Sequence, residues 1–530
     1  MAAGESRGLG RPADPRVDDH RRVAGPLHAG ESGFPQAPVP FWIGGALAAL
    51  AGGVTEWSAR LPSVLACLGT AVLLVLWFDR EVGPALLAGF AFVTTGAALV
   101  WARRAEVDMQ LCFWTTAAMI AYWFALREPV RRRQVLLATA MWLSLAAGVL
   151  TKGPLPFAFL GLAVVATLAF DPAGRRRLRG LLPLAGPLLL VAALMPWVLA
   201  VLIRHPGAIS IWYEQSLGRY AGELGHDKPW TFYAARAPIL WLPWIVPLGL
   251  GIYLAVRRRV LARPAWAFLL FWGVGGLVFL SLGTGKRLHY ALPAVPPMMV
   301  FAGIGLQALA RPPQPLTRRW RWGAWLHGPL VPLALAAGVV AGMWLPEYRS
   351  ALLVLGALAA GGLGLALLLY LRGRPTTGLA ALAAALVVVP AVGYPTVAGP
   401  LLTRSNTEAA IGRCIAARGR SEGAAAAYRH RADPRIVFYA ARPIPVLEDL
   451  AGVAAWRTRI PNGYLVLSHG PGREGLERVG PWRKVFPRRS RTPLASREVV
   501  LLQAVAPPQC HVVYRGPETA PKSEKEVSDE

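Results

Sequence analysis

Residues 108–154 read DMQLCFWTTAAMIAYWFALREPVRRRQVLLATAMWLSLAAGVLTKGP, two apolar runs joined by a short arginine-rich loop. Each run approaches the roughly 20 mostly apolar residues that a helix needs to cross the hydrocarbon core of a bilayer. Arginines beside a span are typical of the cytoplasmic side, so we expect the loop inside and both Asp108 and Lys152 outside. This hairpin predicts a membrane fold together with its sidedness.

The same pattern extends along the whole chain of 530 residues. With 55% hydrophobic residues, 16% charged residues and a mean hydropathy of +0.42, the composition excludes an ordinary soluble protein. We predict a mostly α, polytopic membrane protein with twelve spans, near residues 62–78, 83–101, 110–126, 135–150, 154–170, 181–203, 237–256, 264–282, 290–310, 328–345, 351–372 and 378–399.

The net charge of +27 follows the membrane topology rather than indicating nucleic acid as a partner. Arginines gather in alternate loops, which the positive-inside rule places in the cytoplasm: 127–133, 175–179, 257–263, 311–321 and 372–374. A further patch, at 488–491, fits a solvated surface better than a contact with anionic headgroups.

The sidedness gathers the unusual polar residues at the outer face. There lie Asp108, Lys152, the long loop 204–236, the loop 283–289 and everything after about residue 400. Charged residues beside spans are costly unless they serve a site or reach the headgroup layer, so this face is the expected functional one.

Four regions are expected along the chain. Residues 1–40 form a polar segment that is disordered or a truncated start, and 41–53 fit a helix at the outer interface. A transmembrane domain covers 41–400 and a small extracytoplasmic α/β domain 401–517, before a disordered tail at 518–530. In the α/β domain we predict a helix near 406–418 and strands at 435–439, 464–467, 482–486 and 499–502.

Asp108 is the first candidate for chemistry, because it stands directly before a span. A carboxylate there can act as the general base that accepts a proton from an attacking hydroxyl. Alternatively, Asp108 caps the helix or pairs with Arg103 or Arg104.

Basic residues at the same face suit a lipid-linked phosphate. Lys152 lies in a Lys-Gly-Pro turn with almost no loop, where it either meets a phosphate or reaches for the interface. The loop 283–290 adds Lys286 and Tyr290, and the loop 204–236 is long for a connector. It carries the polar residues expected to contact substrate: Glu214, Arg219, Tyr220, Lys228 and Tyr233.

Metal binding and a disulfide are open alternatives. His205, His226 and His289, with Glu214 or Asp227, can converge on a divalent ion, yet no ligand spacing typical of a metal site is present, so we assign no metal ligand and no cofactor. Cys414 and Cys510 can pair if the tail lies in an oxidising compartment.

An ordered series of short motifs resembles a known family. The series comprises Arg60-Leu61-Pro62-Ser63, Asp108-Met109, Thr151-Lys152-Gly153-Pro154, Pro196-Trp197, Arg219-Tyr220, Lys228-Pro229-Trp230 with Tyr233, Leu242-Pro243-Trp244, and Lys286 with Tyr290 and Pro293. From about residue 38 onward it is similar to the bacterial ArnT-like glycosyltransferases, the 4-amino-4-deoxy-L-arabinose transferases related to protein O-mannosyltransferases.

The resemblance implies a GT-C fold in the inner membrane with a periplasmic active site. It implies a sugar donor linked to a polyprenyl phosphate and an acceptor such as lipid A or another envelope glycan. An acid would assist attack by the acceptor hydroxyl, and basic residues would stabilise the departing phosphate. Asp108, Lys152 and Arg219 match the family's positions for these roles.

The sequence also departs from the family pattern. Relatives begin with a transmembrane helix followed by an Asp-Glu motif, which is absent here, and a later Glu-Lys-Pro-like motif reads Gln36-Ala37-Pro38. Three interpretations follow: a glycosyltransferase with a divergent site or a gene start placed too far downstream, a lipid-binding remnant, and a transporter. A transporter predicts charges within spans and repeat symmetry, and neither is evident.

Overall fold

The computed structural model describes residues 37–82, 86–181, 185–213, 228–312, 317–325, 327–401, 407–418, 425–428, 434–441, 444–460, 463–468, 476, 482–486 and 499–504. The described residues divide into two compact units. The first unit draws on residues 1–340 and 356–389, and the second on 341–355 and 390–530. The domain boundaries expected from the sequence stay predictions.

Apolar helices dominate the chain. Within the described residues, eight helices are long and apolar enough to cross a bilayer, or nine if one bent pair counts as a span. The eight are Glu56–Glu81, Asp108–Arg127, Arg131–Lys152, Ala185–Arg204, Arg263–Leu282, Leu288–Ala310, Pro346–Leu371 and Pro375–Leu401. The polytopic, mostly α fold predicted from the sequence is therefore confirmed.

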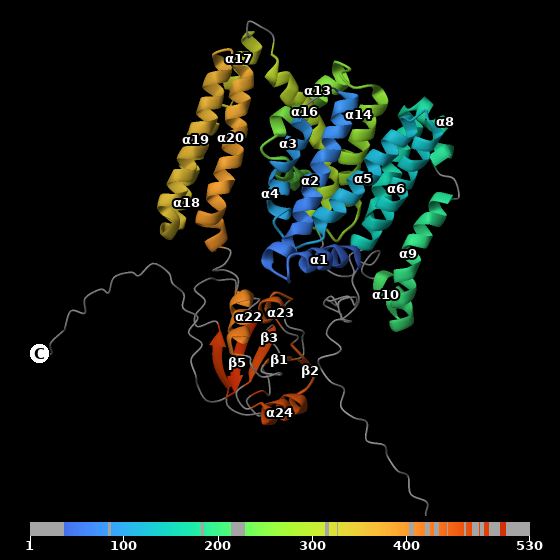
Figure 1. The fold of residues 1–530 in the computed structure, drawn as a ribbon. Helices are drawn as coiled ribbons and strands as arrows, with labels where there is room; N and C mark the ends of the chain where they lie inside the picture. The colour runs from blue at the N-terminus through green and yellow to red at the C-terminus, as the bar shows by residue number, and fades with distance from the viewer. Residues whose placement is uncertain are drawn as a thin grey trace, which may run out of the picture. The chain divides into compact units, whose positions relative to one another are not determined.

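The helices that surround the core follow one another with short connections. In Figure 1, α2, α5 and α6 run beside one another, and α1 lies across their end. In chain order, the described helices that precede the α/β domain are α1 (Val39–Leu50), α2 (Glu56–Glu81), α3 (Leu87–Val93), α4 (Gly96–Trp101), α5 (Asp108–Arg127), α6 (Arg131–Lys152), α7 (Leu155–Phe170), α8 (Pro172–Leu181), α9 (Ala185–Arg204), α10 (Ala208–Tyr213), α12 (Phe232–Trp241), α13 (Ile245–Arg257), α14 (Arg263–Leu270), the π-helix η3 (Phe271–Gly275), α15 (Gly276–Leu282), the 3-10 helix η4 (Leu288–Ala294), α16 (Val295–Ala310), α17 (Arg318–Trp325), α18 (Leu330–Trp344), the 3-10 helix η5 (Pro346–Tyr348), α19 (Arg349–Leu371), α20 (Pro375–Gly393) and the π-helix η6 (Tyr394–Ala398).

Two helices approach each other closely where glycines face backbone. A Cβ atom added to Gly251 of α13 would lie 1.7 Å from the carbonyl oxygen of Phe301 in α16. A Cβ atom added to Gly305 of α16 would lie 1.9 Å from the carbonyl oxygen of Pro247. Small residues at a helix interface allow this contact between backbones, as is common in membrane proteins. The core therefore depends on the absence of side chains at these two positions.

Four predicted spans differ from single long helices. The run 83–101 is interrupted: α3 ends at Val93, and Thr95 caps α4 by accepting a hydrogen bond from the backbone N–H of Ala98 at 3.1 Å. The run 237–256 is split into α12 and α13, which are bent by 101°. The other two, α7 with 16 residues and α18 with 15, are shorter apolar helices. The count of about twelve spans stays a prediction, while these four runs are broken or shorter in the described residues.

The two interrupted runs brace each other. The backbone N–H of Gly96 donates to the carbonyl oxygen of Leu242 at 2.9 Å, and Trp244 Nε1 donates to Thr94 Oγ1 at 3.0 Å. Each break leaves backbone groups without a partner in their own helix, and such groups are costly when buried. The facing break supplies an acceptor for the Gly96 N–H, and the side-chain bond between Trp244 and Thr94 joins the two breaks, so they stabilise each other.

The second unit contains a small α/β domain. Its five-stranded sheet has the order β2-β1-β3-β5-β4, in which β1 pairs in parallel with β2 and β3, while β5 pairs antiparallel with β3 and β4. The elements are α22 (Thr407–Arg418), β1 (Ala425–Tyr428), α23 (Pro434–Ala440), β2 (Val446–Leu447), α24 (Leu450–Arg459), β3 (Tyr464–Ser468), β4 (Trp482–Phe486) and β5 (Val499–Ala504). The α/β character is confirmed, as are the predicted helix near 406–418 and the last three predicted strands.

One strand prediction in this domain was wrong. Residues 435–439 lie in the helix α23, although isoleucine, valine and aromatic residues favour strands. Pro434 is the first helical residue, where its missing N–H costs nothing. Gly412 of α22 also allows close approach, because a Cβ atom there would lie 2.6 Å from the carbonyl oxygen of Ile436. Packing against α22 thus overrides the local propensity.

Candidate functional site

Asp108 and Lys152 meet at one end of the helix hairpin. Asp108 is the first residue of α5, Lys152 is the last of α6, and Lys152 Nζ donates a hydrogen bond to Asp108 Oδ1. A negative charge at a helix start and a positive charge at a helix end both complement the helix dipoles. Gly153 ends α6 with a φ of 94°, a conformation that glycine adopts readily. The Lys-Gly-Pro turn thus holds the lysine against the aspartate.

The alternative roles of Asp108 are not the ones adopted. Val107 precedes the helix, and no side chain caps α5. Arg104 instead contacts Glu106, with Nη1 and Oε1 3.4 Å apart. Ser63 of α2 donates a hydrogen bond to the backbone carbonyl of Glu106 at 2.9 Å, which fixes the segment that leads into α5. Asp108 is therefore placed by α2 as well as by its own helix.

The Asp108–Lys152 ion pair is mostly buried, so its two charges must compensate each other. The side chain of Asp108 is 7% exposed and that of Lys152 is 26% exposed. A buried carboxylate is costly unless a charged partner or hydrogen bonds compensate it. Lys152 compensates Oδ1 of Asp108, and no described residue donates a hydrogen bond to Oδ2. The pair is a neutralised carboxylate with one oxygen left for a further group.

Two aromatic side chains from η4 complete the cluster. His289 Nε2 lies 4.0 Å from Asp108 Oδ1, and the Tyr290 ring centroid lies 5.3 Å from Lys152 Nζ. The two rings pack edge to face, with centroids 4.8 Å apart. The helix η4 is itself anchored, because Trp272 Nε1 donates to the carbonyl oxygen of Pro293 at 2.7 Å. Three separate chain segments thus converge on one acidic, two basic and one phenolic group.

A second group of predicted residues joins two loops. Lys286 is buried and donates from Nζ to the carbonyl oxygen of Lys228 at 2.9 Å, and the Lys228 N–H donates to the carbonyl oxygen of Thr284 at 3.2 Å. Tyr233 donates from its hydroxyl to the carbonyl oxygen of Arg287 at 3.0 Å. These contacts fasten the segment 283–287 to the start of α12. Since that segment leads directly into η4, they also position His289 and Tyr290.

The structure therefore unites some predicted site residues and not others. Asp108, Lys152 and Tyr290 form one cluster, while Lys228, Tyr233 and Lys286 form the adjoining support. Their catalytic and binding roles stay predictions. Six further candidates lie outside the described residues: Glu214, Arg219, Tyr220, His226, Asp227 and Cys510.

The sequence suggests His289 only as one possible metal ligand, whereas the structure places it beside Asp108. Its position next to Tyr290 was the available signal. Among the described residues no group of three His, Cys, Asp or Glu side chains is placed to hold a metal ion. Cys67 and Cys112 are free and buried, whereas Cys414 is disulfide-bonded.

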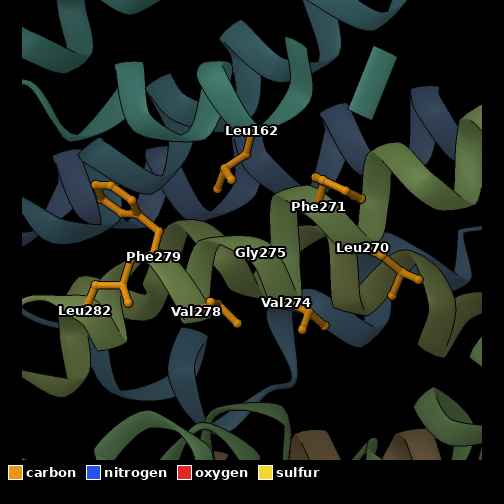
Figure 2. A pocket seen from close by; sticks show the side chains of 8 residues that line it. All are labelled: Leu162, Leu270, Phe271, Val274, Gly275, Val278, Phe279 and Leu282. Carbon is orange, nitrogen blue, oxygen red and sulfur yellow. The ribbon is translucent and has the colours of Figure 1, made fainter. Parts of the chain in front are cut away.

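An apolar pocket of about 490 Å³ lies along the span formed by α14, η3 and α15. In Figure 2 the side chains of Phe271, Val274 and Phe279 border it, with Leu162 of α7 facing them. All of its lining is apolar: Leu162, Leu270, Phe271, Val274, Gly275, Val278, Phe279 and Leu282. Such a surface suits a hydrocarbon chain. Leu282 ends α15, immediately before the segment that carries Lys286.

Comparison with solved structures settles the architecture. ArnT from Cupriavidus metallidurans bound to undecaprenyl phosphate matches with a TM-score of 0.68 at 22% identity, covering 89% of each chain. ArnT of the same organism in the apo state matches with a TM-score of 0.70 at 21% identity, over 90% of this chain and 89% of that one. The chain has the fold of ArnT.

Sequence comparisons agree with that fold. The dolichyl-phosphate-mannose-protein mannosyltransferase family matches residues 16–211. The undecaprenyl phosphate-alpha-4-amino-4-deoxy-L-arabinose arabinosyl transferase of Pseudomonas paraeruginosa is 31% identical over 59% of this chain and 58% of its own length. That of Pectobacterium atrosepticum is 30% identical over 54% and 52%. The matches thus span little more than half of these relatives. The predicted resemblance to ArnT-like GT-C glycosyltransferases is confirmed.

Proposed function

We propose that this protein is an integral-membrane glycosyltransferase that moves a sugar from a polyprenyl-phosphate donor to a cell-envelope acceptor. The observation that carries the proposal is the convergence of Asp108, Lys152, His289 and Tyr290 at one end of the membrane helices. The ArnT fold supports it, because undecaprenyl phosphate is the ligand of the similar ArnT structure. Lipid A is the proposed acceptor, and another envelope glycan is the alternative acceptor.

In the proposed reaction Asp108 acts as the general base and Lys152 stabilises negative charge. In the proposed step the acceptor hydroxyl oxygen forms a bond to the anomeric carbon, and the bond from that carbon to the phosphate oxygen breaks. Asp108 takes the hydroxyl proton on Oδ2, and the polyprenyl phosphate leaves with the electron pair of the broken bond. Lys152 holds Asp108 in place through Oδ1. An ammonium beside the carboxylate also stabilises the negative charge that develops on the leaving phosphate.

Donor binding is proposed to use the same face and the apolar pocket. Lys152 Nζ has three N–H groups, of which Asp108 Oδ1 takes one, so two remain for phosphate oxygens. Tyr290 borders that space, and Arg219 and Lys286 are the further phosphate ligands that we propose. Glu214, Tyr220, Lys228 and Tyr233 are proposed to line the substrate loop. The pocket between α7 and α15 suits an isoprenoid chain, because its lining is apolar.

The proposed location is the inner membrane, with the site and the C-terminal α/β domain on the periplasmic side. Support comes from the arginine-rich loops, which mark the opposite side as cytoplasmic. A multi-pass membrane protein is already established by the helices. No metal ligand is proposed, and a divalent metal stays open for the residues that lie beyond the described ranges.

The experiment reconstitutes the purified protein in liposomes with a polyprenyl-phosphate pentose and lipid A, and follows both lipids by mass spectrometry. We expect the mass of lipid A to rise by one sugar as free polyprenyl phosphate appears in equal amount. Retention of donor without sugar transfer would overturn the proposal in favour of a lipid-binding remnant. Movement of intact donor between the leaflets would overturn it in favour of a transporter.

A further inference from the structure

The end of the helix hairpin opposite Asp108 carries a short helix that is rigidly attached. Asp171 accepts a hydrogen bond from the backbone N–H of Gly174 at 2.8 Å at the start of α8. Its other oxygen pairs with Arg127 Nη2 of α5 at 3.1 Å. The guanidinium of Arg127 lies over the Trp123 ring, 3.0 Å from its centroid. These contacts hold α8 against the core.

The helix α8 separates its residues by type. Gly174, Leu178 and Leu181 are buried, whereas its arginines are exposed. The first residues of α6 lie beside it, because Arg131 Nη1 donates to the carbonyl oxygen of Gly180 at 3.3 Å. Together they make a basic surface of seven exposed arginines: Arg131, Arg132, Arg133, Arg175, Arg176, Arg177 and Arg179.

In the described part of the chain, no carboxylate pairs with this basic surface. Among the described residues no salt bridge involves any of its seven arginines. Their hydrogen bonds go to backbone carbonyls and one amide: Arg131 to Gln134 Oε1 and the carbonyl of Gly180, Arg175 to that of Leu168, Arg176 to that of Pro172, and Arg177 to those of Leu126 and Glu128. A guanidinium has five N–H donors, so most remain available to an anion.

The basic surface lies where membrane headgroups are expected. Val135 and Leu136, one turn after the arginines of α6, are 44% and 61% exposed, and they begin the apolar part of a span. Exposed apolar side chains on a span face the hydrocarbon, and arginines at its end reach the phosphate layer. Basic groups next to spans attract anionic lipids, and guanidinium matches phosphate geometry with paired hydrogen bonds.

We propose that the basic surface is a binding site for the phosphate groups of anionic phospholipids in the surrounding membrane. Bound headgroups bridge α8 and the start of α6, and through Asp171 and Arg127 they brace α5 at the end away from Asp108. This site is independent of the proposed sugar transfer, since it uses none of the residues assigned to that reaction.

The test measures the affinity of the purified protein for phosphatidylglycerol and phosphatidylcholine by native mass spectrometry, with lipid added stepwise. The wild type is expected to bind phosphatidylglycerol more tightly. In the variant Arg175→Gln/Arg176→Gln/Arg179→Gln, that affinity is expected to fall by about 100-fold, since each of the three basic groups near an anionic surface contributes a factor of about five. Affinity for phosphatidylcholine should not change.

A matched control removes the same charge from another loop. The arginines 257–259 at the end of α13 are also exposed, and their triple glutamine variant is expected to lose clearly less affinity, because no hydrogen bond in the described residues joins them to a second arginine-bearing helix. A triple lysine variant of α8 keeps the charge and is expected to retain most of the affinity. Equal losses in both glutamine variants, or no preference of the wild type for phosphatidylglycerol, would overturn the proposal. Displacement of the bound lipid by millimolar inorganic phosphate would overturn the proposal in favour of a site for free phosphate.

Discussion

Removal of the ammonium group of Lys152 should destabilise the protein through the aspartate that it leaves behind. Breaking one side of a fully buried ion pair costs about 3–5 kcal/mol, because the remaining charge has no partner. Since the Lys152 side chain is 26% exposed and that of Asp108 7%, water compensates part of this loss. We therefore expect Lys152→Met to lower the free energy of unfolding by about 2–3 kcal/mol. Most of this loss comes from the buried Asp108 carboxylate, which is left without a partner.

The assay is unfolding by sodium dodecyl sulfate in mixed micelles, followed by tryptophan fluorescence. The double variant Asp108→Asn/Lys152→Met should be more stable than Lys152→Met alone, because the unpaired charge is gone. As a control, Glu106→Gln breaks the Arg104–Glu106 pair, whose side chains are 52% and 43% exposed, and should cost less than about 1 kcal/mol. A double variant no more stable than Lys152→Met would refute the reasoning.

Two further predictions concern the helix core and use the same unfolding assay. Gly251→Ala should lower the free energy of unfolding by about 1–3 kcal/mol, since its Cβ atom would lie 1.7 Å from a carbonyl oxygen of α16. As a control, Gly249→Ala on the same helix should be neutral, because its Cβ atom would meet nothing within 4 Å. Equal effects of the two substitutions would contradict the close approach of the helices. Thr94→Val should lower the free energy of unfolding by about 1–3 kcal/mol, because it leaves the buried Trp244 N–H without an acceptor. Trp244→Phe should lower it by about 1 kcal/mol, because the Thr94 hydroxyl keeps its hydrogen bond to the carbonyl oxygen of Phe90. The opposite order would argue against the hydrogen bond between the two breaks.

Periodicity and charge were enough to predict the membrane helices, but not where they break. The run 83–101 is apolar except for Thr94 and Thr95, and these two threonines lower its hydropathy too little to mark a stop. Besides the cap at Thr95, Leu242 and Trp244, about 150 positions later, stabilise the break by supplying hydrogen-bond partners. A pattern read along the chain contains no information on such distant hydrogen bonds.

The candidate site shows the same division. Asp108 and Lys152 were predicted to share one membrane face, and the structure brings them into contact. The sequence left three roles open for Asp108, since an aspartate before a helix is equally suited to capping. The sequence suggests His289 only as one possible ligand of an unassigned metal site, and its closeness to Asp108 could not be predicted because it depends on how η4 packs against α5. Residue type and side of the membrane were predictable, whereas pairing required the fold.

The most direct test of the central claim separates donor binding from sugar transfer at Asp108. In liposomes, the variant Asp108→Asn should retain the polyprenyl-phosphate sugar with an affinity close to that of the wild type, because the amide keeps the shape of the side chain. Sugar transfer to lipid A should fall by at least about 100-fold, the lower end of what a positioned general base contributes. Glu106→Gln, two residues earlier, should transfer sugar normally. Unchanged transfer by Asp108→Asn would contradict the account.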